Sequence, residues 1–143
     1  MVVSSKGRYA LRVMVELAAA PQGEYQPLAR ISEGQGISEK YLEAIFAPLA
    51  KAGFVEGQRG KNGGYRLTKP AKDYTVGSIL RLTEKTLAPV SCMAEGAPAC
   101  GRAHQCTTRA MWHGLDKLIN DYFDGITLAD LVNTAQPGND YVI

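Results

Sequence analysis

The sequence lacks any long uninterrupted hydrophobic run, although 45% of its 143 residues are hydrophobic and 21% are charged. Charged side chains interrupt positions 1–20, which excludes the apolar core of a signal peptide; they are Lys6, Arg8, Arg12 and Glu16. No later segment is apolar over the length that spans a bilayer. The sequence therefore predicts a cytoplasmic protein with no membrane partner.

Motifs of common enzymes are also missing. The glycine-rich segment 57–64 fits neither a P-loop nor a dinucleotide-binding fingerprint, and the strand-to-helix context of those motifs is absent. Neither of the two histidines stands with an acidic residue in an arrangement that would activate a cysteine nucleophile. We therefore expect that the protein is not an enzyme.

Cysteine is scarce and odd in number. Cys92, Cys100 and Cys106 fall within fifteen consecutive residues, in a loop-like segment rich in glycine, alanine and proline. Three thiols cannot all pair within one chain, and cytosolic thiols are kept reduced. This group of soft ligands therefore favours metal binding or redox sensing over a disulfide framework.

The pattern of apolar residues that is present predicts helices in the first half of the chain. Over residues 4–20, one helical face is formed by Leu11, Met14, Val15 and Ala18. Pro27 suits the first position of a short second helix, which glycines end near Ile37. This predicts two consecutive helices separated by a polar connection.

Ser38 fits the N-cap of a third helix over residues 38–51. Apolar residues recur at helical spacing and form the predicted buried face of this helix, at Leu42, Ile45, Phe46 and Leu49. Pro48 predicts a kink or an early loosening of its second half. The tight turn containing Gly36 gives the pair the outline of a helix-turn-helix, in which residues 38–51 are the recognition helix.

Two short strands, 54–55 and 65–67, flank the glycine-rich segment and predict a hairpin. Its tip carries Arg59 and Lys61, as the wing of a winged helix would. Between residues 51 and 72 there are six basic residues against the single acid Glu56, so the remainder of this chain of net charge +2 is net negative. Such local positive charge is typical of a nucleic-acid contact, although a solvated surface is the simpler alternative.

A further helix is predicted within residues 74–84, and a longer one from Thr107 to Phe123. One stripe of the long helix is formed by Met111, Leu115, Leu118, Ile119 and Tyr122, and Ala110, Trp112 and Phe123 widen its apolar surface. We interpret it as a dimerisation helix, the alternative being packing on its own domain. Thr127 and Asp130 predict the start of a short last helix.

The predicted fold is mainly α with a small β-wing: a winged helix-turn-helix domain plus a long dimerisation helix. We divide the chain into a DNA-binding domain at 1–84, a cysteine-containing cluster loop at 85–106, the dimerisation helix with the short C-terminal helix at 107–135, and a loose tail at 136–143.

Four runs of residues carry a family resemblance: SSKGRYALRVM at 4–14, PLARISEGQGISEKYLEAIFAPLAKAGFV at 27–55, RGKNGGYRL at 59–67 and ITLADLV at 126–132. Together they resemble the IscR, NsrR and CymR (Rrf-type) family of bacterial winged-helix transcription regulators, over nearly the whole chain. The resemblance implies a homodimer on double-stranded DNA with a two-fold-related site.

The resemblance also implies roles for single residues of the recognition helix and wing. Ser38, Lys40 and Tyr41 would contact the DNA backbone or base edges, and Glu43 would accept from a cytosine amino group. Arg59 would enter the minor groove, and Lys61 lies beside it on the wing. The alternative for Glu43 is an exposed helix residue paired with Lys40.

In family members with cysteines at this place, the three thiols hold an iron–sulfur cluster, so the resemblance implies a cluster on Cys92, Cys100 and Cys106, with [2Fe–2S] favoured and [4Fe–4S] as the alternative. The spacing of Cys92 and Cys100 is longer than in the IscR type. Arg109 and Arg8 stand where relatives keep a fourth ligand. His104 is the leading candidate for that ligand, and His113 and Glu95 are weaker ones; a small thiol or water is the other option.

The sequence therefore predicts a regulator that senses iron–sulfur status, oxidants or nitric oxide, whether as repressor or activator. A regulator without a cluster is the alternative, either with thiols modified directly or with zinc stabilising the loop. Arg102, inside the loop, could favour a reactive thiolate.

Overall fold

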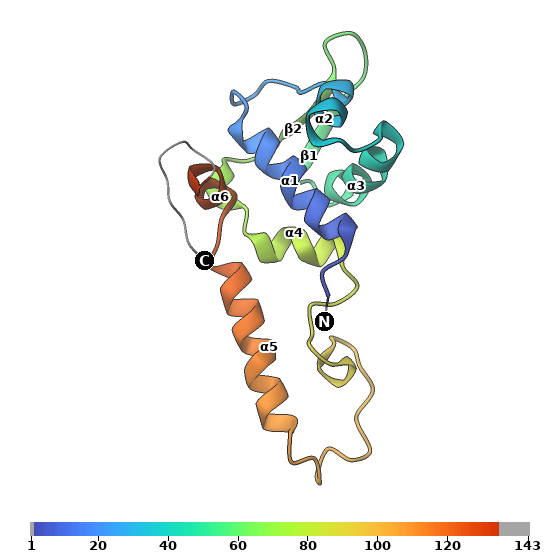
Figure 1. Cartoon of the computed structure of the whole chain (residues 1–143), viewed down its shortest axis with the longest axis vertical. Helices are drawn as coiled ribbons and strands as arrows, with labels where there is room; N and C mark the ends of the chain where they lie inside the picture. The colour runs from blue at the N-terminus through green and yellow to red at the C-terminus, as the bar shows by residue number, and fades with distance from the viewer. Residues whose placement is uncertain (1, 135–143) are drawn as a thin grey trace.

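A computed structural model describes residues 2–134, and within them the fold is helical apart from one small sheet (Figure 1). The elements run α1 (Ser5–Ala19), α2 (Leu28–Gln35), α3 (Glu39–Lys51), β1 (Val55–Gln58), β2 (Gly64–Leu67), η1 (Ala71–Asp73), α4 (Val76–Thr83), η2 (Ser91–Met93), α5 (Arg109–Asp124) and α6 (Leu128–Thr134). The predicted fold class, mainly α with a β-wing, is confirmed. No helix in this range combines the length and the apolar character needed to cross a membrane.

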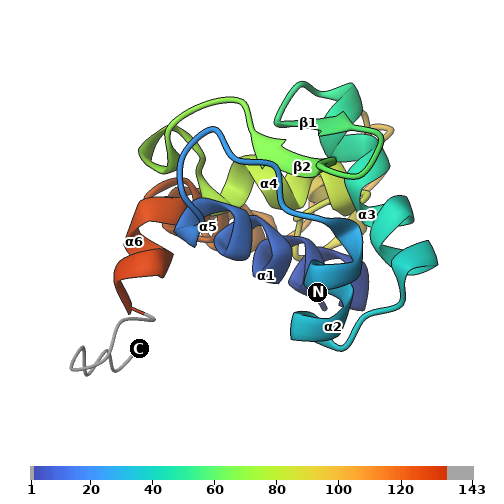
Figure 2. The same ribbon diagram turned by 90° about the horizontal axis from the view of Figure 1, so that it is seen from above.

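The core forms around α1, which crosses the middle of the domain (Figure 2). Its fully buried side chains are Ala10, Val13 and Met14. The predicted buried face was only partly right, because Leu11, Val15 and Ala18 are half-buried at the edge of this core. Apolar residues occupy two adjoining faces of α1, and packing against α3, α4 and α6 decides between them.

The helix-turn-helix forms largely as its local sequence predicts. Ser38 caps α3 by accepting a hydrogen bond from the Tyr41 N–H at 3.2 Å, and the four predicted apolar residues of α3 are buried. Gly36, at a left-handed φ of 67°, ends α2. Pro27 is the N-cap of α2 and not its first residue. Helix α3 continues three residues beyond Pro48, because the Ala52 N–H still bonds the Pro48 carbonyl.

The wing is a two-stranded antiparallel hairpin in which Val55 pairs with Leu67 and Gln58 with Gly64. The connection before α2 extends this sheet, since Gln26 and Tyr65 exchange backbone hydrogen bonds of 2.8 and 3.0 Å. Gly64 makes this close approach possible: a Cβ there would lie 1.9 Å from the Gln26 carbonyl oxygen. The wing is therefore fixed to the helix-turn-helix at its base and projects at its tip.

Tyr74 anchors the other side of the wing. This side chain is 1% exposed, and its hydroxyl donates to the Phe54 carbonyl at 2.6 Å. The same oxygen accepts from the backbone N–H groups of Thr68 and Lys69 at 3.0 and 3.1 Å. One buried hydroxyl thus satisfies three backbone groups where the chain leaves β2 and turns towards α4.

After α4 the chain leaves the domain, forms the cysteine loop, and returns through α5, which projects away from the other helices (Figure 1). The predicted capping arrangement of α6 is confirmed: the Thr127 N–H donates to Asp130 and the Asp130 N–H donates to Thr127 Oγ1. Helix α6 packs on α1, with Leu128 fully buried in the core. The tail predicted at 136–143 lies outside the described residues.

Candidate DNA-binding interface and cysteine loop

The N-terminal end of α3 presents a polar, solvent-exposed surface. Ser38, Lys40 and Glu43 are exposed there, as a recognition helix requires. The alternative pairing of Glu43 with Lys40 is not observed, since no ion pair joins the two side chains. Both side chains are therefore available to a ligand.

Tyr41 differs from these neighbours because it is half-buried against α1. Its ring meets the ring of Tyr9 edge-on, with centroids 6.0 Å apart. The guanidinium of Arg12 lies 5.2 Å from the Tyr9 ring centre and donates to the Gln35 backbone carbonyl at 2.7 Å. Tyr9 and Arg12 thus support α3 and α2 from one helix. The sequence prediction missed both residues, because only the fold brings these positions together.

The wing tip and the helix-turn-helix border one surface hollow. It is lined by Arg59 and Lys61 of the wing, by the start of α2, and by two residues of α3, Glu39 and Ala50. Both basic side chains are exposed and have no ion pair with any described residue. The predicted wing residues therefore share a concave surface with Glu39 and Ala50 of α3, whereas Ser38, Lys40, Tyr41 and Glu43 do not line it.

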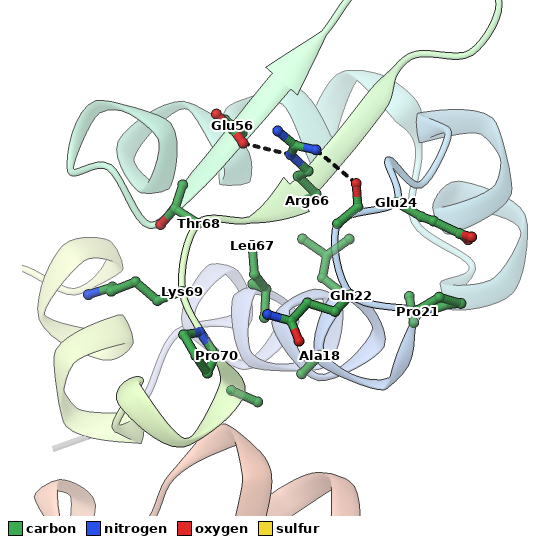
Figure 3. A pocket seen from close by; sticks show the side chains of 14 residues that line it. Ala18, Pro21, Gln22, Glu24, Glu56, Arg66, Leu67, Thr68, Lys69 and Pro70 are labelled. Atoms are coloured by element: carbon green, nitrogen blue, oxygen red, sulfur yellow. Dashed lines mark hydrogen bonds and ion pairs between the residues drawn. The ribbon is translucent and has the colours of Figure 1, made fainter.

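Not all of the basic residues of segment 51–72 are free to meet a polyanion. Arg66 bonds Glu56 across the strands at 2.6 Å and the Gly23 carbonyl at 2.8 Å (Figure 3). Its guanidinium also lies over the ring of Tyr25. Lys69 lies over the rings of Phe54 and Tyr74. Among these basic residues, Arg66 and Lys69 therefore stabilise the base of the wing, whereas Arg59 and Lys61 at its tip carry charge exposed to solvent.

The three cysteines are free thiols, and all are exposed. Cys92 lies in η2, Cys100 in the following coil, and Cys106 just before α5. Cys106 Sγ lies 3.5 Å from Thr108 Oγ1, and this hydrogen bond lowers the pKa of the Cys106 thiol below its usual value. The backbone of Thr108 and the nearby Arg109 act in the same direction.

The structure does not gather these thiols into a preformed site. Between residues 2 and 134, no group of three or more histidine, cysteine or acidic side chains is placed to hold a metal ion. The candidate fourth ligands His104, His113 and Glu95 are likewise exposed. The donor chemistry nevertheless fits an iron–sulfur cluster, because three accessible thiols on one loop can bind iron once the loop closes around it.

Helix α5 exposes its apolar stripe to solvent. Exposed fractions are 55% for Met111, 67% for Leu118 and 53% for Tyr122, and α5 has no buried residue. Phe123 is half-buried: it packs against the cluster of Val76, Leu80 and Leu87, and it also borders an apolar hollow with Leu118, Ile119 and Tyr122 of the stripe. An apolar stripe of this kind is typical of a surface that a partner covers.

Comparison with known proteins places these features in a family. Residues 3–134 match the Rrf2 family, described as an iron-dependent transcriptional regulator. The chain belongs to the Rrf2 family. It is 40% identical over 132 residues to the HTH-type transcriptional regulator IscR of Photobacterium profundum, covering 92% of this chain and 76% of that one.

Solved structures of Rrf2 regulators support the same family assignment. T. potens IscR matches with a TM-score of 0.77 and 34% identity, covering 100% of this chain and 94% of that one. CymR, the global cysteine regulator of B. subtilis, matches with a TM-score of 0.77 and 32% identity, covering 95% of this chain and 99% of that one. The family is one of transcriptional regulators, which confirms that this Rrf2 chain is not an enzyme and is a DNA-binding transcription regulator.

Two positions considered for a fourth ligand, 8 and 109, are occupied by arginine. Arg8 lies exposed on the first turn of α1 and donates to Ser5 Oγ at 3.2 Å. Arg109 is the first residue of α5. A guanidinium keeps its proton and does not ligate a metal, so neither residue can act as a fourth ligand.

Proposed function

We propose that this Rrf2 regulator is a homodimer that binds a two-fold-related site on double-stranded DNA. Support for DNA reading comes from the exposed Ser38, Lys40 and Glu43 at the start of α3 and from the exposed wing residues Arg59 and Lys61. Tyr41 would contribute its hydroxyl while its ring rests on Tyr9. Support for the dimer comes from the uncovered stripe of α5, which a second copy would bury.

The regulator further carries an iron–sulfur cluster on Cys92, Cys100 and Cys106, with [2Fe–2S] favoured over [4Fe–4S]. The single observation that carries this proposal is the placing of three exposed, unpaired thiols on one loop that leads directly into the dimer helix. His104 is the candidate fourth ligand from within the loop. The family description as iron-dependent agrees with this metal.

Such a cluster would report iron–sulfur status, oxidants or nitric oxide from the cytoplasm. A cluster held by three exposed thiolates on one loop is open to small molecules, and its gain or loss would change the course of the loop before α5. That change would alter the relative placing of the two DNA-binding domains of the dimer.

The test is anaerobic reconstitution with iron and sulfide, followed by visible spectroscopy and by DNA retardation before and after cluster removal. We expect thiolate-to-iron absorption that disappears in a triple Cys→Ala variant, and retardation that differs between the two forms. His104→Ala should shift the absorption and speed cluster loss, whereas His113→Ala should leave both unchanged. A colourless protein that contains no iron after anaerobic purification and reconstitution would overturn the cluster.

One observation favours a second candidate, a cluster-free regulator whose thiols are modified directly. The thiols are exposed but not brought together, so each is open to oxidants by itself. Mass spectrometry after mild oxidation distinguishes the two, because the cluster-free regulator retains a thiol adduct or a disulfide. Bound zinc without colour would instead support a zinc-stabilised loop.

A further inference from the structure

The side chain of Glu84 reaches back to the beginning of α1. Its Oε1 accepts hydrogen bonds from the Ser4 backbone N–H at 2.9 Å and from Ser4 Oγ at 2.7 Å. Glu84 is also the C-cap residue of α4 and the last residue before the loop that starts at residue 85. One carboxylate therefore joins the start of α1, the end of α4 and the start of the cysteine loop.

This carboxylate orients the N-cap of α1. An ionised carboxylate only accepts hydrogen bonds, so the Ser4 hydroxyl donates its single proton to Glu84. The lone pairs of Ser4 Oγ are then free to accept from the Gly7 N–H, which lies at 3.1 Å. Negative charge near a helix N-terminus is also favourable because it opposes the positive end of the helix dipole. Glu84 thus fixes the first turn of α1 through Ser4.

Gly7 shows how closely the carboxylate approaches this turn. A Cβ at position 7 would lie 2.2 Å from Glu84 Oε1. The backbone of Gly7 is not at positive φ, so space and not backbone conformation favours glycine here. Gly7 is buried in the middle of a well-formed helical turn, where alanine would ordinarily be preferred. The absent side chain at this position is what admits the Glu84 carboxylate.

The turn that Glu84 fixes leads directly to the support of the recognition helix. Tyr9 follows Gly7 by two residues, and its ring holds the ring of Tyr41. We propose that Glu84 is a positioning residue for DNA binding, which holds the first turn of α1 so that Tyr9 keeps α3 in its reading position. This inference rests on the DNA-binding function proposed above. Glu84 immediately precedes the cysteine loop, so the inference also links the start of that loop to the position of α3.

The experiment compares Glu84→Ala with Glu24→Ala, an exposed carboxylate whose side chain bonds no described residue. The DNA probe is the duplex that the unaltered chain enriches from a randomised pool. For Glu84→Ala we expect the dissociation constant to rise about fivefold or more, a typical size for coupling between sites, with Glu24→Ala within about twofold. Hydrogen exchange at the Gly7 amide should accelerate in Glu84→Ala alone, while amides in the middle of α1 stay protected.

A double-variant cycle with Gly7→Ala tests the contact itself. Alone, Gly7→Ala displaces the carboxylate and should weaken duplex binding about as much as Glu84→Ala does. In the double variant the carboxylate is gone, and the remaining close atom, Val3 Cγ1 at 3.2 Å from the added Cβ, needs to move by only a few tenths of an ångström, so Gly7→Ala should add little further loss. The inference would be overturned if the fold increases in dissociation constant of the two single variants multiply in the double variant. It would also be overturned if Glu84→Ala binds the duplex within about twofold of the unaltered chain.

The outcome also separates this inference from the function on which it rests. If the unaltered chain enriches no duplex, the proposed DNA binding fails, and the positioning role fails with it. If the unaltered chain binds its duplex and the Glu84 variants bind equally well, only the positioning role is wrong.

Discussion

The winged-helix body (residues 2–84 with α6) and the arm (residues 85–124) differ in how far their apolar side chains are buried. In the body, Phe46 and Met14 are fully buried and the hydroxyl of Tyr74 satisfies three backbone groups. In the arm, α5 buries no residue, and the stripe from Met111 to Tyr122 faces solvent. The body is therefore held together by internal packing, whereas the arm presents apolar side chains to solvent, as surfaces that a partner covers commonly do.

The largest effect on stability should come from removing a large side chain from the core of the body. Phe46→Ala removes a fully buried ring that stacks on Tyr65 with centroids 4.1 Å apart. We expect the free energy of unfolding to fall by about 3–5 kcal/mol, measured by urea denaturation. The matched loss in the arm, Tyr122→Ala, should cost less than about 1 kcal/mol in dilute, monomeric protein. Equal costs for the two changes would remove the distinction between body and arm.

A charge on the arm should instead act on assembly. Leu118→Glu places a carboxylate on the most exposed residue of the stripe. Because a dimer would have to bury this charge, its dissociation constant should rise roughly 100-fold, or about 3 kcal/mol. Sedimentation equilibrium measures this change, and Lys117→Gln, next to the stripe, is the control. An unaltered chain that stays monomeric at high concentration would contradict the proposed dimer.

Removing one oxygen from the body should have an intermediate effect. Tyr74→Phe removes three hydrogen bonds of a buried hydroxyl, and the Phe54 carbonyl keeps only longer bonds of 3.4 Å from Thr68. We expect a loss of about 1–2 kcal/mol in unfolding free energy, because each such bond contributes to stability. Tyr122→Phe in the arm should change stability by less than the error of the same denaturation curves.

The smallest effect concerns the ion pair that joins body and arm. Arg81 of α4 binds Asp124 of α5 at 2.7 Å and Asn120 at 2.7 Å, and the bond to Asp124 raises the pKa of Arg81. Both partners are more than one-third exposed, so Arg81→Met should cost only about 0.5–1 kcal/mol. Thermal unfolding should show this loss shrinking in 1 M salt, because screening weakens exposed pairs. A loss that is unchanged by salt would indicate lost packing of the Arg81 stem instead.

The same comparison shows which features could be predicted from sequence. The caps at Ser38 and Thr127 depend on residues three apart, and both predictions are confirmed. The fold class and the family followed from ordered local motifs. The buried face of α1 was only partly predicted, because packing against helices later in the chain decides which of its apolar residues are buried. The contact of Ser4 with Glu84 joins residues 80 positions apart, so no local pattern could reveal it.

The candidate site divides in the same way. The positions of Lys40, Glu43, Arg59 and Lys61 follow from a helix cap and a hairpin, which are short-range features. The supporting residues Tyr9 and Arg12 act through tertiary contacts and were missed. A ligand shell around the thiols requires a loop closure that the chain alone does not dictate, so it stays a prediction.

The way the arm is attached has a consequence for how such proteins diverge. The chain leaves the body at Glu84, the end of α4, and returns beside the start of α4, where the Val76 N–H bonds the Ile126 carbonyl at 2.8 Å and the Leu128 N–H bonds the Tyr74 carbonyl at 3.0 Å. Insertions or deletions between these two anchors leave the DNA-reading helices in place. Changes in the length or cysteine spacing of this insert, such as the seven residues between Cys92 and Cys100, can thus arise without displacing α2 and α3.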